Sequence, residues 1–225
     1  MINLTEIKTT KRNYRHIESE VLIIGLFQDK KLNPQQKVID KAFGNQLSHA
    51  MELDGFTGKK DTRLSLYGNE SIKRILLVGL GKHKDYTTDI TRSIASNLTR
   101  YAAELKIESF SVDGDSNGLK KNSIAQAFAE GLVLGSYQFN EYKTKKDENT
   151  MASLVTVCGD VDKKAMEIGR VLGVSVCFSR DLGNHPANIL TPTYLSREAN
   201  TIAKDSPKME CHIFDLKELK KMGMG

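Results

Sequence analysis

The amino-acid sequence predicts an α/β protein with a mixed, largely parallel sheet flanked by helices. Three observations support this fold class. Short apolar runs, several of them β-branched, alternate with stretches of helical periodicity up to about residue 159. A long helical pattern then covers 160–184, and a rigid Asn-Pro turn separates it from a last helix–strand–helix pattern. We therefore expect a first domain at 1–159, a linker helix at 160–184 and the truncated start of a second α/β domain at 185–225.

The first elements are read from apolar patterning and turn residues. We expect an edge strand within 2–8 and a strand buried on both faces at Val21–Phe27. Asn33 followed by Pro34 begins a helix. Apolar residues continue at helical spacing through this helix, which ends at Asp54-Gly55; they are Val38, Ile39, Ala42, Phe43, Leu47, Ala50 and Met51.

The middle of the chain repeats the strand–helix alternation. Arg63–Tyr67 is typical of a half-buried strand and Arg74–Leu80 of a fully buried one. A helix begins near Thr88, capped by residue 87, 88 or 89, and carries an apolar stripe to Leu105. The next three elements are expected as a strand at 109–112, a helix at about 123–137 and a strand at 151–158. This order predicts a layered α/β domain.

The last part contains the long helix and the turn. Asp160 or Asp162 caps a helix whose apolar side is marked by residues such as Ile168, Leu172 and Val176. Pro186 ends that helix by Asn184, because proline disfavours the α conformation in the residue before it. We then expect a helix at about 192–204, begun by a Thr-Pro pair, a strand at 209–214 and a helix at 216–222.

Seven apolar residues after Pro186 are patterned for burial, although about forty residues are too few to form a core by themselves. We therefore expect the region after Pro186 to be loosely packed or aggregation-prone in this chain, and strong amide-exchange protection throughout 190–222 would contradict this.

Composition places the chain among ordinary globular proteins. Hydrophobic residues make up 39% and charged residues 27% of its 225 residues. The longest apolar run is far short of a bilayer-spanning helix, and the first residues do not resemble a signal peptide. We predict a cytoplasmic protein without a membrane partner. Cys158, Cys177 and Cys211 form no Cys-x-x-Cys pair, which favours buried free thiols.

The charge balance gives a weak indication of partners. The 33 Lys and Arg residues exceed the 28 Asp and Glu residues by five, and the excess is scattered in small groups. Nucleic-acid binders concentrate positive charge on one face with aromatic residues interleaved. This scatter favours a solvated surface over nucleic-acid binding.

Candidate sites for catalysis are weak in the sequence. Gly79-Leu80-Gly81-Lys82 follows a buried strand as a phosphate-binding turn would. However, Lys84 stands where a dinucleotide fingerprint needs glycine, and Leu76 stands where a P-loop needs it. An ordinary turn is therefore the favoured interpretation. Ser175 lies within a helix and lacks the second glycine of a nucleophile elbow, so we expect a structural role for it.

Metal ligands are also missing from the pattern. The five histidines are isolated, and no His-Glu-x-x-His segment occurs; they are His16, His49, His83, His185 and His212. The carboxylates form no convincing cluster. We therefore predict no catalytic, cofactor-binding or metal-binding residue in these 225 residues.

Arg180–Leu195 resembles a segment of a known family. Its pattern Arg-x-Leu-x-Asn-x-Pro-x-Asn-x-Leu-Thr-Pro is similar to the segment that joins the two domains of leucyl aminopeptidases, the M17 cytosol aminopeptidase family. Three further pieces agree in order and spacing: Gly55–Lys59, Leu77–Gly81, and Glu130 to Lys145. The resemblance covers nearly the whole chain, and the linker motif is its most specific part.

The resemblance implies a macro-domain-like fold for the first domain. For the full-length protein it implies an aminopeptidase that removes N-terminal residues from peptides with two divalent metals, zinc or manganese, as a homohexamer. In the family these metals are held by segments of the Lys-Gly-x-x-Phe-Asp and Asn-Thr-Asp-Ala-Glu-Gly-Arg types, and neither occurs here. We therefore expect this chain to be inactive alone, with its domain serving assembly and substrate access.

Two other functions remain open at this stage. A free-standing module of this fold could bind ADP-ribose or another nucleotide through Gly79–Gly81. An accessory role in DNA binding would rest on the weak positive charge alone.

Overall fold

The computed structural model describes residues 6–11, 17–144 and 151–224. The chain separates into two compact units, Met1–Phe178 and Ser179–Gly225, and each is considered by itself. Within these described ranges, no helix is both long enough and apolar enough to cross a membrane.

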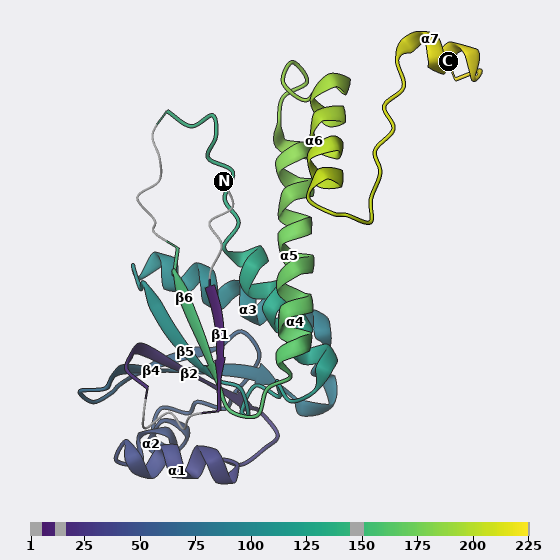
Figure 1. The fold of residues 1–225 in the computed structure, drawn as a ribbon. Helices are drawn as coiled ribbons and strands as arrows, with labels where there is room; N and C mark the ends of the chain where they lie inside the picture. The colour runs from purple at the N-terminus through teal and green to yellow at the C-terminus, as the bar shows by residue number, and fades with distance from the viewer. Residues whose placement is uncertain (1–5, 12–16, 145–150, 225) are drawn as a thin grey trace. The chain divides into compact units, whose positions relative to one another are not determined.

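The first unit is built on a six-stranded mixed sheet in the order β1-β6-β5-β2-β4-β3 (Figure 1). Its strands are β1 (Glu6–Thr10), β2 (Ser19–Phe27), β3 (Arg63–Tyr67), β4 (Ile72–Gly81), β5 (Ser109–Asp113) and β6 (Leu154–Cys158). All neighbouring pairs are parallel except β3 with β4, which are antiparallel. The predicted fold class is therefore confirmed, and the expected edge strand begins at Glu6 within the described residues.

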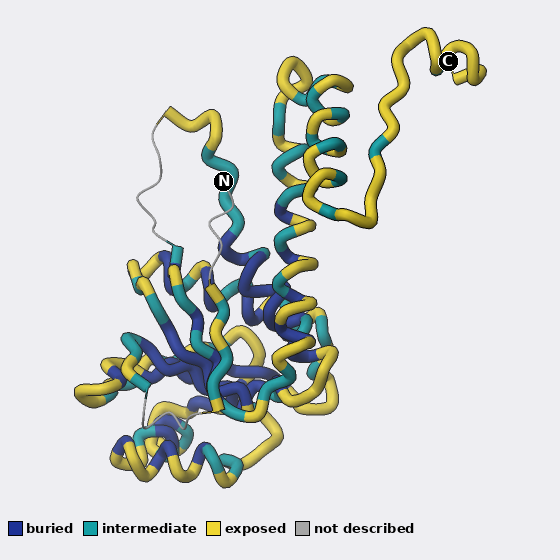
Figure 2. Tube along the Cα trace, in the orientation of Figure 1, coloured by how far each residue is buried: buried dark blue, intermediate teal, exposed yellow. Residues whose placement is uncertain are grey.

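Helices cover both faces of this sheet, so the unit has three layers. On one face, β2 and β4 pack with α1 (Pro34–Ala42) and α2 (Gln46–Glu52) around Leu22, Ile24 and Leu77. On the other face, α3 (Thr88–Glu104) and α4 (Asn122–Gly135) enclose the larger core around Phe110 and Phe128. The buried residues concentrate in the strands and in these inner helix faces (Figure 2).

The single helix predicted from Pro34 to Asp54 is wrong, because the structure contains two helices there. Gly44 and Asn45 both adopt positive φ, at 67° and 60°, which ends α1 and turns the chain into α2. Ile39, Phe43, Leu47 and Ala50 remain buried as predicted. Val38 lies instead on the outer side of α1 and is 39% exposed.

A capping box fixes the start of α1. The Asn33 side chain accepts a hydrogen bond from the Gln36 amide, and the Gln36 side chain accepts one from the Asn33 amide, both at 2.8 Å. We expect Asn33→Ala to lower the free energy of unfolding by about 1 kcal/mol, because it leaves a helix N–H without its acceptor. Urea denaturation of the full chain measures this, and Asn33→Ser, which keeps a capping oxygen, should recover most of the loss. Equal losses in both variants would contradict the capping explanation.

The long helix α5 (Lys163–Asn184) begins at Asp162, whose carboxylate accepts from the Ala165 amide at 3.0 Å, and it ends where Pro186 was predicted to stop it. Its packed face differs from the prediction. Small residues, Gly169 and Gly173, lie against α4. The large apolar residues at 168, 171, 172 and 176 are 42–48% exposed.

The second unit contains two further helices, α6 (Pro192–Lys204) and α7 (Leu216–Lys221). Thr191 caps α6 with its hydroxyl and Pro192 occupies the first turn, as predicted. The strand expected at 209–214 is wrong, since this segment has no regular secondary structure and pairs with no strand among the described residues. None of the described residues from 179 to 224 is buried, which accords with the expectation that this region has no core of its own.

Candidate functional site

The carboxyl ends of the parallel strands are the usual place for a site in an α/β sheet. The segment Gly79–Gly81, expected to form a turn, is instead the end of β4 at this edge, and its two glycine amides are already hydrogen-bonded. Gly79 N–H donates to the Thr62 carbonyl at 2.9 Å and Gly81 N–H to the Gly58 carbonyl at 3.0 Å. A Cβ on Gly79 would lie 1.9 Å from the Lys59 carbonyl oxygen. The two glycines therefore allow the end of β4 to approach the backbone of residues 58–62. Because the Gly79 and Gly81 amides already donate to carbonyl groups there, they are not available to bind a phosphate.

A buried polar cluster follows β5 at the same edge. The Ser116 hydroxyl and the Asn117 side-chain amide both donate to the Asp113 carbonyl, at 3.0 and 2.8 Å, and the Gly25 amide of β2 donates to the Ser116 hydroxyl at 3.1 Å. Burial raises the pKa of the Asp113 carboxyl to about 6. Within the described protein, Asp113 Oδ2 and Asn117 Oδ1 are buried with no hydrogen-bond partner. The cluster ties β5 to β2, and the sequence analysis did not identify it as a candidate site.

The candidate nucleophiles are structural. Burial raises the pKa of the Cys158 thiol to about 12, so this thiol stays protonated at neutral pH. Cys177 is also buried, and Cys211 is half-buried, so the predicted burial holds for two of the three thiols. Ser175 lies in α5 and its hydroxyl donates to the Val171 carbonyl at 2.9 Å, as expected for a residue within a helix.

The described histidines lie apart from one another. His83 contacts Phe27 edge-on, His185 lies against the ring of Tyr194, and His212 Nε2 is 3.5 Å from Glu210. His49 is exposed, and His16 lies outside the described residues. Among the residues that the structure describes, no three His, Cys, Asp or Glu side chains are grouped to hold a metal ion. These residues therefore do not fit a two-metal centre.

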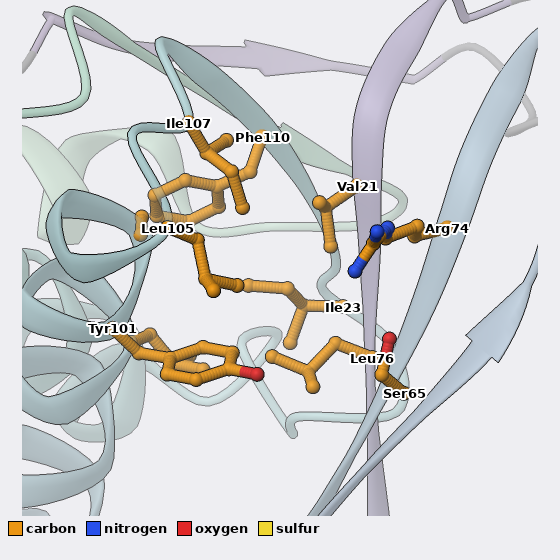
Figure 3. Close-up of a pocket in the computed structure, with 11 residues that line it drawn as sticks. Val21, Ile23, Ser65, Arg74, Leu76, Tyr101, Leu105, Ile107 and Phe110 are labelled. Carbon is orange, nitrogen blue, oxygen red and sulfur yellow. The ribbon is translucent and has the colours of Figure 1, made fainter.

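A narrow apolar slot opens between the carboxyl half of α3 and the sheet (Figure 3). Eight of its eleven lining residues are apolar, and they come from β2, β4, α3, β5 and the α3–β5 turn. The three polar ones are Ser65 of β3, Arg74 of β4 and Tyr101 of α3. The Arg63 guanidinium lies 4.1 Å from the centre of the Tyr101 ring. Sequence reasoning missed this slot because its residues are scattered over six segments of the chain.

The chain matches the model of the cytosol aminopeptidase family, N-terminal domain, over residues 23–146. Proteins named "Probable cytosol aminopeptidase" from Sulfurihydrogenibium sp. and Persephonella marina are 32% and 31% identical to it, over 98% and 97% of this chain. The chain spans only 45% and 46% of those relatives. It thus corresponds to less than half of their length.

Solved structures agree with this assignment. A mutant of tomato leucine aminopeptidase superposes with a TM-score of 0.78 at 26% identity, covering 99% of this chain and 46% of that one. The bottromycin maturation enzyme BotP shares the fold, with a TM-score of 0.68 at 21% identity over 91% of this chain and 41% of that one. With a family match over more than half of its residues, the chain belongs to the cytosol aminopeptidase family, of which it contains the N-terminal domain.

Proposed function

We propose that this chain is the N-terminal portion of a metal-dependent leucyl aminopeptidase that removes N-terminal residues from peptides. The observation that carries the proposal is the match over nearly the whole chain to less than half of each aminopeptidase relative. The segment Arg180–Leu195, which resembles the family's interdomain linker, lies within this match and agrees with the proposal. In this proposal 1–159 is the N-terminal domain, 160–184 the linker helix and 185–225 the start of the catalytic domain.

The chemistry of the proposed enzyme belongs to segments outside these 225 residues. Two divalent ions, zinc or manganese, would lower the pKa of a bridging water and polarise the scissile carbonyl. Because the described residues do not fit such a centre, the chain is proposed to be inactive alone. Its sheet domain would contribute to assembly of a cytoplasmic homohexamer and to substrate access.

The second unit favours a role as part of a larger domain over a free-standing module. Ile202, Ile213 and Phe214 are 43–54% exposed, although their spacing is typical of buried positions. The nucleotide-binding alternative depended on Gly79–Gly81 as the binding segment. This is disfavoured because the Gly79 and Gly81 amides donate to backbone carbonyls. This comparison favours the aminopeptidase proposal.

The test begins with the coding sequence beyond the codon for Gly225. We expect the reading frame to continue into the two metal-binding segment types named above. The extended protein should hydrolyse leucine p-nitroanilide in the presence of Mn²⁺ or Zn²⁺ and lose that activity to a chelator, whereas residues 1–225 alone should show no turnover. A stop codon directly after Gly225, or an extended protein without peptidase activity, would refute the proposal.

A further inference from the structure

We propose that the edge strand β3 pairs antiparallel with β3 of a second copy of this chain, so that two six-stranded sheets join into one. The inference rests on three features of the strand: unpaired backbone groups, a sequence that is complementary to itself, and an exposed aromatic side chain that matches a positioned guanidinium. It concerns the first unit alone and does not depend on peptidase activity.

The outer side of β3 presents backbone groups without partners. The hydrogen bond from the Gly79 amide to the Thr62 carbonyl fixes which residues of the ladder face β4. Because these residues alternate along an antiparallel ladder, the N–H and C=O groups of Arg63, Ser65 and Tyr67 point away from the sheet. No backbone hydrogen bond joins these groups to another residue in the described ranges, and all three residues are exposed. The edge is therefore open to another strand.

The strand also lacks the features that usually protect an edge, which are lysine, proline and bulges. The register of β3 on β4 is unbroken, and the strand contains neither lysine nor proline. Its one charged group, the Arg63 guanidinium, lies 4.1 Å from the centre of the Tyr101 ring, over the face of the sheet that α3 covers. The opposite edge strand, β1, instead exposes Glu6 and Lys8. Of the two edges, β3 is the one suited to pairing.

The sequence of β3, Arg-Leu-Ser-Leu-Tyr, is complementary to itself when two copies run antiparallel about Ser65. In this register Ser65 faces Ser65 of the second copy, and the two residues exchange both of their backbone hydrogen bonds. Leu64 faces Leu66 of the second copy on the side of α1 and α2, where both leucines are half-buried. Arg63 faces Tyr67 of the second copy on the side of α3. Each pair is therefore of a kind that stabilises neighbouring strands.

Tyr67 loses the most exposed surface in this pairing. It is 85% exposed, and no large apolar side chain in the described part of the chain is more exposed. Ser65, in the same strand, lines the slot beside Tyr101 (Figure 3), so alternate residues of β3 lie on the side of α3. The ring of Tyr67 would meet an Arg63 side chain that Tyr101 already holds in place, which lowers the entropy cost of the contact. A second copy supplies an aromatic residue at this position by symmetry.

Sedimentation velocity of the full chain over a series of concentrations tests the pairing. We expect a reversible monomer–dimer equilibrium at micromolar concentration, because one pair of short strands covers little surface. Ser65→Pro should weaken the association by about tenfold or more, because it removes the two central N–H donors of the dimer and leaves the bonds to β4 in place. Ser65→Thr keeps the N–H group and should associate like the native chain. Thermal unfolding verifies that each variant is folded.

Tyr67→Lys provides a second test that spares the fold, because this side chain is 85% exposed. The new lysine would face Arg63 of the second copy, and like charges opposite each other destabilise a strand pair. The association should therefore weaken as in Ser65→Pro. Adding Arg63→Glu to Tyr67→Lys makes the facing charges opposite and should restore it.

Cysteine crosslinking identifies the register, in a Cys211→Ser background because the other two native thiols are buried. The Cα atoms of a hydrogen-bonded antiparallel pair lie about 5.5 Å apart, a distance that a disulfide spans. Ser65→Cys should therefore give a covalent dimer when its two thiols are oxidised with copper phenanthroline. Tyr67→Cys should not, because the two copies of residue 67 are about 13 Å apart in this register. A chain that stays monomeric, association that is unaffected by Ser65→Pro, or crosslinking through residue 67 and not 65 would overturn the proposal.

Discussion

Gly169→Ala is expected to destabilise the first unit by about 3 kcal/mol, although alanine is the better helix former. The reason is the close approach of α5 to α4. A Cβ on Gly169 would lie 2.1 Å from the Gln126 carbonyl oxygen and 3.0 Å from the Ala129 Cβ. Neither neighbour is the end of a flexible side chain, so the two helices would have to move apart and their contact would loosen.

The matched control lies in the same helix. Gly183 has no atom within 4 Å of the position where its Cβ would be. Gly183→Ala should therefore stabilise the protein slightly, by at most about 1 kcal/mol, from helix propensity alone. Chemical denaturation of the two variants, followed by circular dichroism, gives the comparison. If both substitutions stabilised the protein, the conclusion that Gly169 packs too closely against α4 to accept a Cβ would be contradicted.

Asp113→Asn is expected to stabilise the protein at pH 8 by about 3 kcal/mol and to have little effect near pH 3.5. Burial raises the pKa of Asp113 from 3.8 to about 6. Below 3.8 the carboxyl group is protonated in both the folded and the unfolded chain. As the pH rises from 3.8 to about 6, the unfolded chain releases its proton while the folded chain retains it. The native protein therefore loses stability across this window, and asparagine removes that loss.

The measurement is the difference in unfolding free energy between the native chain and Asp113→Asn at several pH values, so that titration of all other groups cancels. Asp160→Asn is a useful control, because a hydrogen bond from Lys120 holds the pKa of Asp160 below its usual value. Its effect should have the opposite sign. A difference for Asp113→Asn that did not change between pH 3.5 and pH 8 would contradict a buried carboxyl group that titrates in this window.

Most of the sheet domain was predictable because local signals and tertiary packing agree there. β3 matches its predicted bounds, and Thr87 and Thr191 cap helices as their positions indicated. The errors occur where local patterning is insufficient. Gly44 was read as part of a continuous helix, although two left-handed residues in succession end it. The segment 209–214, which includes Glu210 and His212 between apolar residues, was expected to be a strand but has no neighbouring strand among the described residues, and a strand requires a partner.

The candidate slot could not be read from the sequence. Ser65, Arg74 and Tyr101 are ordinary residues at unremarkable positions, and only the sheet order brings them together. The face on which α5 packs was also misjudged, because glycine contributes nothing to an apolar stripe. Yet glycine is what permits a helix to approach a neighbouring backbone closely. Apolar patterning therefore identifies contacts made by large side chains, but it does not detect a contact in which glycine lets two helix backbones approach each other.

The sheet order has a consequence for how the protein forms during synthesis. β1 leaves the ribosome first, but its hydrogen-bonding partner is β6, with Glu6 opposite Leu154 and Thr10 opposite Cys158. β2 and β4 can pair early, β5 adds to them, and β6 joins afterwards. The first strand must therefore wait, unpaired, until almost the whole domain has been translated. The sheet therefore forms outward from its central strands, and β1, the first of the six strands to be synthesised, is added after β6.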